Sequence, residues 1–162
     1  MLPTDLEAIL HVLFSAGVRF VVVGEIAMRL HGCAHITDDV DISYARDREN
    51  LKALANALEN HCARLRGIPE DIPFVLDEFT FRNVQNLTLQ TNLGELDLLA
   101  VPDGADSFEG LWERSSEMSL GEFAVHVASI DDLITMKRAA NRPKDQAHIY
   151  ELLALKKLLS EG

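Results

Sequence analysis

The part of the sequence that decides the fold consists of two short segments, VRFVVVGE at residues 18–25 and TDDVDI at residues 37–42. The first is a run of β-branched and aromatic residues, typical of a buried strand, and it ends at a glycine. The second alternates acidic and apolar residues, which is typical of a strand with one polar and one buried face. We therefore expect two strands joined by a short helix over residues 25–31.

The polar face of the second strand carries Asp39 and Asp41, whose side chains project side by side. Two carboxylates so close together repel each other unless a positive charge lies between them. A hard divalent cation such as Mg²⁺, or Mn²⁺, supplies that charge, because it prefers carboxylate oxygen and substrate phosphate as ligands. The alternative is that both acids lie on the exposed face of an edge strand and bind nothing.

A third acid on another predicted strand strengthens the metal interpretation. Asp97 lies in the segment GELDLLA at residues 94–100, and Glu95 shares its face of that strand. Three carboxylates from two strands are the ligand set that a two-metal phosphoryl-transfer site needs, and one of them can accept the proton of the attacking hydroxyl. Glu95 competes for the third position but lies nearer the turn, so we rank Asp97 first.

The rest of the chain reads as helices and strands in alternation. Apolar periodicity, capping residues and turn signals predict helices over 4–16, 47–62, 108–113, 129–140 and 143–160, strands over 86–90, 94–100 and 123–127, and a turn-rich loop over 66–78. We expect one α/β (or α+β) domain over residues 1–162, with a mixed β-sheet flanked by helices. Its core spans about 17–130, and a C-terminal helix pair spans about 130–160.

The charge balance limits the classes of partner. The chain of 162 residues has 15 Lys and Arg against 26 Asp and Glu, a formal net charge of −11. Phosphate backbones repel such a surface, so we expect no broad nucleic-acid interface and no attachment to an anionic membrane. The first residues have no basic stretch followed by an apolar run, so we expect no signal peptide and a cytoplasmic location.

Five motifs resemble one known family in their order and spacing. They are VVVGE at 21–25, HG at 31–32, TDDVDISYARD at 37–47, RGIP at 66–69 and DDLITMKRAANRPKD at 131–145. Together they resemble the nucleotidyltransferase superfamily with the polymerase-β-like minimal fold. The match is to its small bacterial branch related to the AbiEii/MenT-type toxin nucleotidyltransferases, and it extends over roughly residues 17–155.

The resemblance implies transfer of a nucleoside monophosphate from an NTP to a hydroxyl acceptor, with Mg²⁺ or Mn²⁺ as the cofactor. It implies that Asp39, Asp41 and Asp97 hold the metal ions and that Asp97 is the base. The nucleotide-binding residues it implies are Gly24, Glu25, Thr37, Lys137, Arg142 and Lys144. The acceptor would be a tRNA, a protein or a small molecule. A cognate antitoxin would be a partner if the chain belongs to a toxin–antitoxin or phage-defence pair.

Two positions depart from the family pattern. Glu25 stands where the family usually has Gly or Ser, and a carboxylate repels phosphate there. His35 stands where the family often has Arg, so that a fixed cation becomes a titratable one. A catalytically degenerate nucleotide- or partner-binding module is therefore the alternative function. A transition-metal site at His31 and His35, and a merely solvated basic stretch around Lys137, are the alternatives for individual residues.

Overall fold

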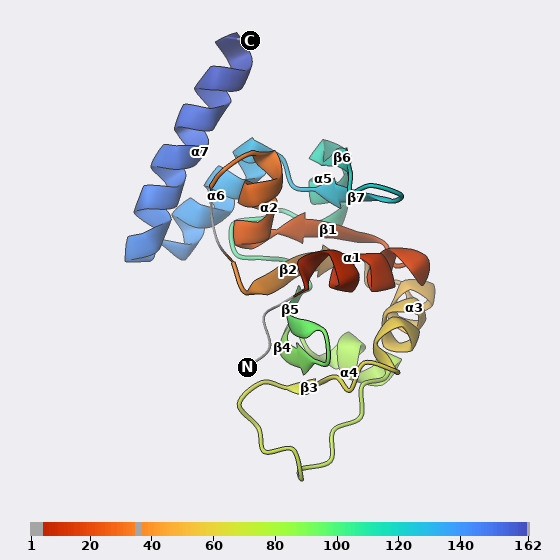
Figure 1. Cartoon of the computed structure of the whole chain (residues 1–162). Helices are drawn as coiled ribbons and strands as arrows, with labels where there is room; N and C mark the ends of the chain where they lie inside the picture. Colours follow the sequence, from red (N-terminus) through yellow and green to blue (C-terminus); the bar gives the residue numbers. More distant parts are fainter. Residues whose placement is uncertain (1–4, 35–36, 162) are drawn as a thin grey trace.

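The computed structural model describes residues 5–34 and 37–161, in which helices and strands alternate (Figure 1). The helices are α1 (Leu6–Ser15), α2 (Gly24–His31), α3 (Arg48–Leu58), α4 (Glu78–Asn83), α5 (Phe108–Arg114), α6 (Ile130–Ala140) and α7 (Pro143–Glu161). The strands are β1 (Phe20–Val23), β2 (Asp39–Tyr44), β3 (Arg64–Leu65), β4 (Asn86–Thr91), β5 (Gly94–Leu99), β6 (Ser116–Ser119) and β7 (Ala124–Val127).

The strands of the described residues form a single seven-stranded sheet in the order β3-β4-β5-β2-β1-β7-β6. Its central strand, β2, is antiparallel to β1 and parallel to β5. β1 is also parallel to β7, whereas β3–β4, β4–β5 and β6–β7 are antiparallel pairs. The predicted single α/β domain with a mixed sheet is confirmed, and the acidic strand lies at its middle.

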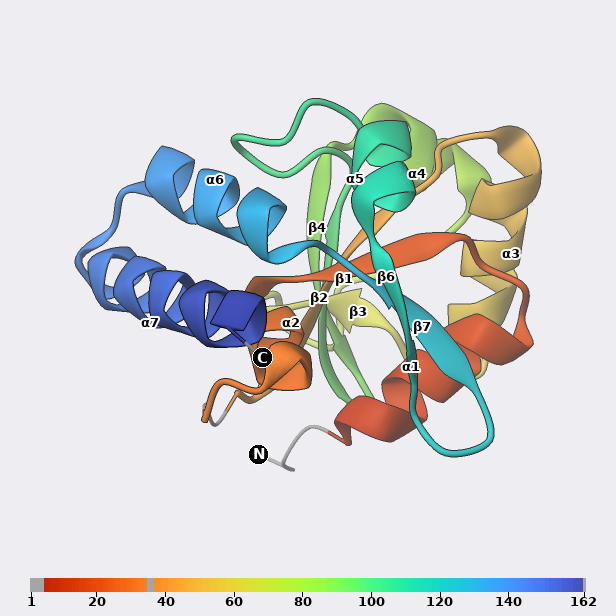
Figure 2. The ribbon, with the colours of Figure 1, turned by 90° about the horizontal axis from the view of Figure 1, so that it is seen from above.

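The two faces of the central strands differ in character. On one face Val40 and Ile42 of β2 are completely buried beside Leu96 and Leu98 of β5. Burial of each such side chain contributes about 1.5–3 kcal/mol to folding. Helices α1 and α3 lie on this side of the sheet, where Ile9 of α1 approaches Leu96 (Figure 2). Because side chains alternate along a strand, the acids of β2 and β5 lie on the opposite face.

A C-terminal helix pair, α6 and α7, packs together on the side of the sheet away from α1 and α3 (Figure 2). The hydroxyl of Ser129 accepts a hydrogen bond from the backbone N–H of Asp132, which caps α6 as predicted. Asn141 ends α6 in the left-handed conformation, and Pro143 begins α7, where its missing N–H costs nothing. No described helix is long and apolar enough to cross a membrane.

Three short elements are missing from the sequence prediction: β3, α4 and β6. β3 has only two residues and β6 has four, and both lie at edges of the sheet, where no apolar alternation is required. α4 is a short helix capped by Asp77 at the end of the expected loop. The predicted start of the first helix at residue 4 lies outside the described residues, and Asp5 caps α1.

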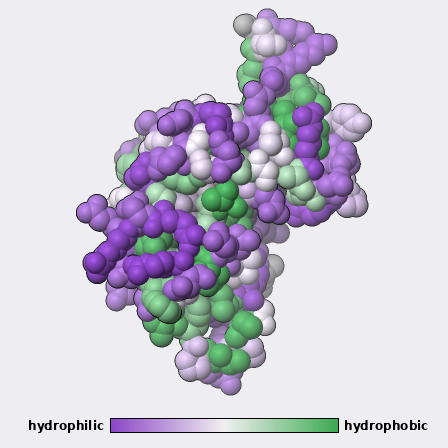
Figure 3. Space-filling model, turned by 180° about the vertical axis from the view of Figure 1, so that it is seen from behind, coloured by the Kyte–Doolittle hydropathy of each residue, from purple (hydrophilic) through white to green (hydrophobic). Residues whose placement is uncertain are grey.

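Apolar side chains are exposed in the connection between β3 and α4 and at the start of α4. Ile72, Val75 and Phe79 are 52%, 70% and 68% exposed. The connection forms the lower end of the molecule in Figure 1, and the space-filling view has a hydrophobic surface at the same end (Figure 3). This end lies far from α7.

Candidate functional site

Three carboxylates meet on the open face of the central strands. β2 and β5 run parallel with Asp41 directly opposite Asp97, and Asp39 is two residues before Asp41 on the same face. One oxygen from each of the three side chains lies within 4.8 Å of the others. Glu95 is opposite Asp39 in the register, but its carboxylate lies 3.6 Å from Nε of Arg66 and outside the cluster. The acids brought together are therefore Asp39, Asp41 and Asp97.

Asp41 is the carboxylate whose surroundings are least favourable to a negative charge. Burial, followed by the charges of Asp39 and Asp97, raises the pKa of Asp41 to about 8. Its Oδ1 is buried and has no hydrogen-bond partner in the described part of the chain. A buried carboxylate oxygen without a partner is costly, and a bound cation would remove that cost.

Gly24 makes the close approach to Asp41 possible. It has φ +73° at the junction of β1 and α2, and a Cβ there would collide with the carboxylate of Asp41. Only glycine gives the backbone this conformation and leaves the space. Gly24 therefore lies at the site, and its immediate neighbour there is the carboxylate of Asp41.

Thr37 positions Asp39. Its hydroxyl lies 3.0 Å from Oδ1 and 3.2 Å from the backbone oxygen of Asp39, and it donates to this residue. Thr37 is 8% exposed and is absent from the lining of the cleft described below. The structure therefore places Thr37 against Asp39 and outside the lining of the cleft.

Arg66 is a member of the site whose role the sequence did not indicate. Its Nη2 donates to Oδ1 of Asp97 at 2.8 Å and to the backbone oxygen of Leu89 at 3.0 Å. Burial raises the pKa of Asp97, and the hydrogen bond and charge of Arg66 oppose that rise. Arg66 belongs to the quoted RGIP motif, but its approach to β5 depends on the pairing of β3 with β4, which no pattern indicated.

The cations of the C-terminal helix pair are organised by Asp145. This residue of α7 is completely buried and accepts from Nε of Arg142 at 2.8 Å and from Nη2 at 3.2 Å. Nζ of Lys137 in α6 lies 3.4 Å from Oδ1 of Asp145, the oxygen that also accepts from Nη2 of Arg142. Burial opposes ionisation, yet these partners hold the pKa of Asp145 far below its usual range. Sequence reasoning assigned Asp145 only to the helix terminus, whereas it fixes both cations.

Glu25 is paired with a cation. It is the second residue of α2, and its carboxylate lies 3.2 Å from Nζ of Lys144 and 4.0 Å from Nε2 of His148. Burial would raise the pKa of Glu25, but the hydrogen bond and charge of Lys144 outweigh it and lower the pKa. Lys144 of α7 therefore forms an ion pair with this carboxylate of α2.

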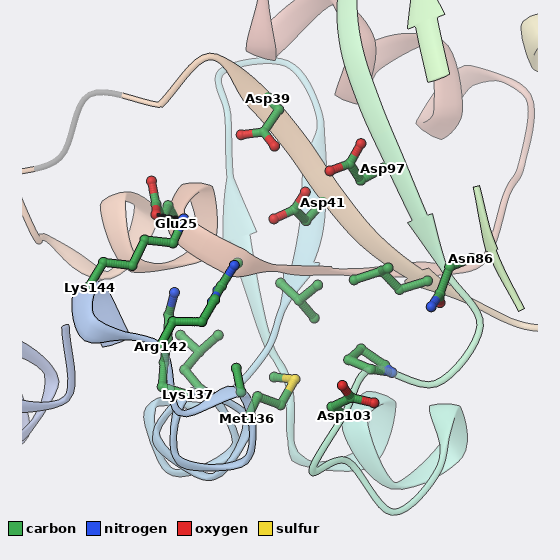
Figure 4. Close-up of a pocket in the computed structure, with 16 residues that line it drawn as sticks. Glu25, Asp39, Asp41, Asn86, Asp97, Asp103, Met136, Lys137, Arg142 and Lys144 are labelled. Carbon is green, nitrogen blue, oxygen red and sulfur yellow. Dashed lines mark hydrogen bonds and ion pairs between the residues drawn. The ribbon is translucent and has the colours of Figure 1, made fainter. Parts of the chain in front are cut away.

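The aspartate triad on the sheet and the cations of the helix pair line opposite sides of one cleft of about 450 Å³ (Figure 4). It is lined by Val23, Gly24, Glu25, Asp39, Asp41, Asn86, Asp97, Leu99, Pro102, Asp103, Leu133, Met136, Lys137, Ala140, Arg142 and Lys144. The volume is in the range of pockets that hold cofactors and substrates. The oxygen donors of the triad suit a hard divalent cation, and the orphaned Oδ1 of Asp41 supports that fit.

The histidine alternative receives no support from the described residues. Nε2 of His31 lies 2.7 Å from the backbone oxygen of Ala128, so this ring connects α2 to the end of β7. His35 lies outside the described residues. The group of metal-ligating side chains that the described part of the chain does contain is the aspartate triad.

Comparisons with known proteins give no family. No protein-family model matches the chain, and no curated protein matches it. The described residues form a single α/β domain whose mixed sheet carries an acidic triad, Asp39, Asp41 and Asp97, that could hold a metal ion.

Proposed function

We propose that this chain is a Mg²⁺- or Mn²⁺-dependent nucleotidyltransferase of the polymerase-β-like superfamily. The observation that carries the proposal is the arrangement of opposite charges in one cleft, with the triad on the sheet and Lys137, Arg142 and Lys144 on the helix pair. A metal ion with a triphosphate needs both, because carboxylates bind the cation and amines and guanidinium groups bind the phosphates. An exposed acidic strand face would need no cationic wall opposite it.

The three acids share one role, and Asp97 has a second. Asp39, Asp41 and Asp97 would hold the divalent cation, which supplies charge neutralisation at the phosphate oxygens when bound. Thr37 keeps Asp39 oriented through its hydroxyl. Asp97 accepts the proton of the acceptor hydroxyl, and the hydrogen bond from Arg66 orients its carboxylate. The acceptor oxygen bonds to the α-phosphorus, the bond from that phosphorus to the bridging oxygen breaks, and pyrophosphate leaves.

The helix-pair cations bind the triphosphate and stabilise its departing negative charge. Lys137 and Arg142 are held in place by the buried carboxylate of Asp145, so they are oriented before substrate arrives. Lys144 reaches the same wall from the first turn of α7. Gly24 lines the cleft and begins α2, and backbone N–H groups at the start of a helix favour an anion.

The biological setting follows from the same family resemblance. We propose that the chain acts as the toxin-type member of a toxin–antitoxin or phage-defence pair and that a cognate antitoxin binds it. The hydroxyl acceptor belongs to a tRNA, a protein or a small molecule. The net charge of −11 favours an acceptor with a small phosphate footprint.

A second candidate function is a nucleotide-binding module without turnover. The ion pair between Glu25 and Lys144 favours this function, because the Glu25 carboxylate already neutralises a lysine that would otherwise bind phosphate. Removal of Glu25 distinguishes the two. In a degenerate module Glu25→Gly creates turnover, whereas in an active enzyme the native chain already turns over.

Incubation with NTPs labelled on the α-phosphate, Mg²⁺ or Mn²⁺ and candidate acceptors tests the proposal. We expect metal-dependent release of pyrophosphate that disappears in Asp41→Asn and persists in Asp38→Asn. Asp38 is the matched control, because it is an exposed neighbour that does not line the cleft. Nucleotide binding without pyrophosphate release would favour the module, and absence of nucleotide binding would overturn both functions.

A further inference from the structure

The end of the cleft away from Lys144 differs chemically from the rest. Its apolar lining includes Leu99 at the end of β5, Pro102 in the following loop, and Met136 of α6. The polar side chains at this end are Asn86 and Asp103, and both lie far from Lys144 in the close-up (Figure 4). An apolar slot with a few polar groups at its rim is the usual form of a site for a flat organic group.

The loop that carries Asp103 is fixed against α6. The backbone N–H of Ala105 donates to the oxygen of Pro102 at 3.0 Å, which closes a tight turn around Asp103 and Gly104. Gly104 has φ +85°, and a Cβ there would lie 2.7 Å from Cβ of Ala139 and 2.9 Å from the backbone oxygen of Thr135. The turn therefore packs directly on the helix backbone, and Asp103 has a defined place at the rim.

Asp103 is an exposed residue at the rim of the cleft. Within the described residues, no hydrogen bond or ion pair engages its carboxylate, and no cation of the helix pair reaches it. Its acceptor oxygens are thus available to a ligand in the cleft. The side-chain amide of Asn86, at the start of β4, adds one donor and one acceptor at the same end.

We infer that this end of the cleft is the base subsite and that it selects guanine nucleotides; the inference rests on the proposed function. The triphosphate lies between the triad and the cationic wall, so the base extends to the opposite end. The ring contacts Met136, whose polarizable sulfur suits an aromatic face. The carboxylate of Asp103 accepts hydrogen bonds from N1–H and the 2-amino group of guanine.

The hydrogen-bonding edges of the four bases explain the selection. Guanine presents two adjacent donors, which match the two oxygens of one carboxylate, and its O6 can accept from the Asn86 amide. Adenine and cytosine each present one amino donor next to a ring acceptor, so only one oxygen of Asp103 is satisfied. Uracil places carbonyl oxygens on both sides of its single donor, and these repel the carboxylate. A good bidentate contact favours its base by about tenfold or more in affinity.

Binding of α,β-methylene analogues of GTP, ATP, CTP and UTP in the presence of Mg²⁺ tests the inference without turnover. We expect the guanine analogue to bind at least about tenfold more tightly than each of the others. The corresponding inosine analogue lacks only the 2-amino group, and we expect it to lose most of this advantage. In Asp103→Asn the preference should disappear, whereas the matched control Asp71→Asn, in the exposed loop before α4, should keep it.

The outcomes separate this inference from the proposed function. Equal binding of all four analogues, or a guanine preference that survives in Asp103→Asn, would overturn the base assignment and leave the nucleotidyltransferase proposal standing. In that case the apolar end belongs to the acceptor. Failure of every analogue to bind a folded, metal-loaded chain would overturn both. Circular dichroism of each variant establishes that a loss of binding is not a loss of folding.

Discussion

The carboxylate of Asp41 lies so close to Gly24 that residue 24 cannot carry a side chain. The missing Cβ of Gly24 leaves the space that the Asp41 carboxylate fills, because β1 and β2 pair with Val23 opposite Asp41. The turn after β1 and the Asp41 carboxylate are therefore a single structural unit. A change in the turn must move the acid.

Gly24→Ala should displace the Asp41 carboxylate and abolish stabilisation by Mn²⁺. The matched control is Gly17→Ala, because Gly17 has a similar φ of +76° but no atom near its missing Cβ. Both variants incur backbone strain of about 1 kcal/mol. Only Gly24→Ala should also lose the rise in melting temperature on addition of Mn²⁺, measured by calorimetry. Equal responses of the two variants to Mn²⁺ would refute the role of Gly24.

The free energy of unfolding should depend on pH through Asp41 in the metal-free protein. Its pKa is raised to about 8, so the folded state binds a proton that the unfolded state releases near pH 4. The contribution of Asp41 is fully present below about pH 4 and is lost as the pH rises through about 8. Asp41→Asn should therefore increase stability at pH 8 by about 1–3 kcal/mol and change it little at pH 4.

Thermal melts in EDTA at both pH values measure this effect, with Asp38→Asn as the control for a charge change at an exposed neighbour. Addition of Mg²⁺ at pH 8 should stabilise the native chain and leave Asp41→Asn unchanged. If Asp41→Asn is no more stable than the native chain in EDTA at pH 8, the negative charge of Asp41 does not destabilise the metal-free protein, and the prediction is wrong.

Asp145→Asn should be strongly destabilising, because it leaves Lys137 buried without its charge partner. Lys137 is 6% exposed, and loss of one member of a buried pair costs about 3–5 kcal/mol. The pair joins α6 to α7, as does the exposed pair between Asp131 and Lys156. Asp131→Asn is therefore the matched control and should cost less than about 1 kcal/mol in urea denaturation.

The double variant Lys137→Met with Asp145→Leu should recover much of the stability that Asp145→Asn loses, because it leaves no charge buried. The same double variant should lose triphosphate binding, since Arg142 loses its partner and the cleft loses a cation. Equal losses in Asp145→Asn and Asp131→Asn would show that the buried pair has no special importance.

Arg66→Gln should increase the affinity for Mn²⁺ in the absence of nucleotide by about tenfold. Arg66 lies against Asp97, so its positive charge competes with a cation for that carboxylate. Arg64→Gln is the control, because Arg64 pairs with Glu70 near the same strand but away from the triad. Isothermal titration calorimetry measures the affinities, and an unchanged or weaker affinity in Arg66→Gln would contradict this competition.

Most of the fold could be predicted because its central elements have strong local patterns. The apolar run of β1, the alternation of β2 and the capping of α6 by Ser129 each depend on residues close together in the sequence. β3 and β6 could not be found, because short edge strands need neither alternation nor a continuous apolar run. Asp39 and Asp41 could be predicted as a pair because they are two residues apart on one strand, so their side chains share a face.

The parts of the site that escaped prediction depend on contacts between distant segments. Asp97 could be predicted only on the assumption that its strand lies beside β2, which the register of the two strands fulfils. Arg66, 31 residues before Asp97, arrives through an edge strand that left no pattern. Asp145 becomes the partner of Lys137 only because α7 packs on α6. The apolar pattern of each helix indicates that it is buried, but it does not indicate which helix it packs against.

The division of the cleft between sheet and helix pair has a consequence during synthesis. The three acids of the triad and Gly24 are all translated before residue 100, whereas the cations and Asp145 follow residue 136. A nascent chain therefore possesses its carboxylate wall while Lys137, Arg142 and Lys144 are still missing. The cationic wall is complete only when α7, which carries Lys144 and Asp145, emerges from the ribosome and packs on α6, so the cleft is completed late in synthesis.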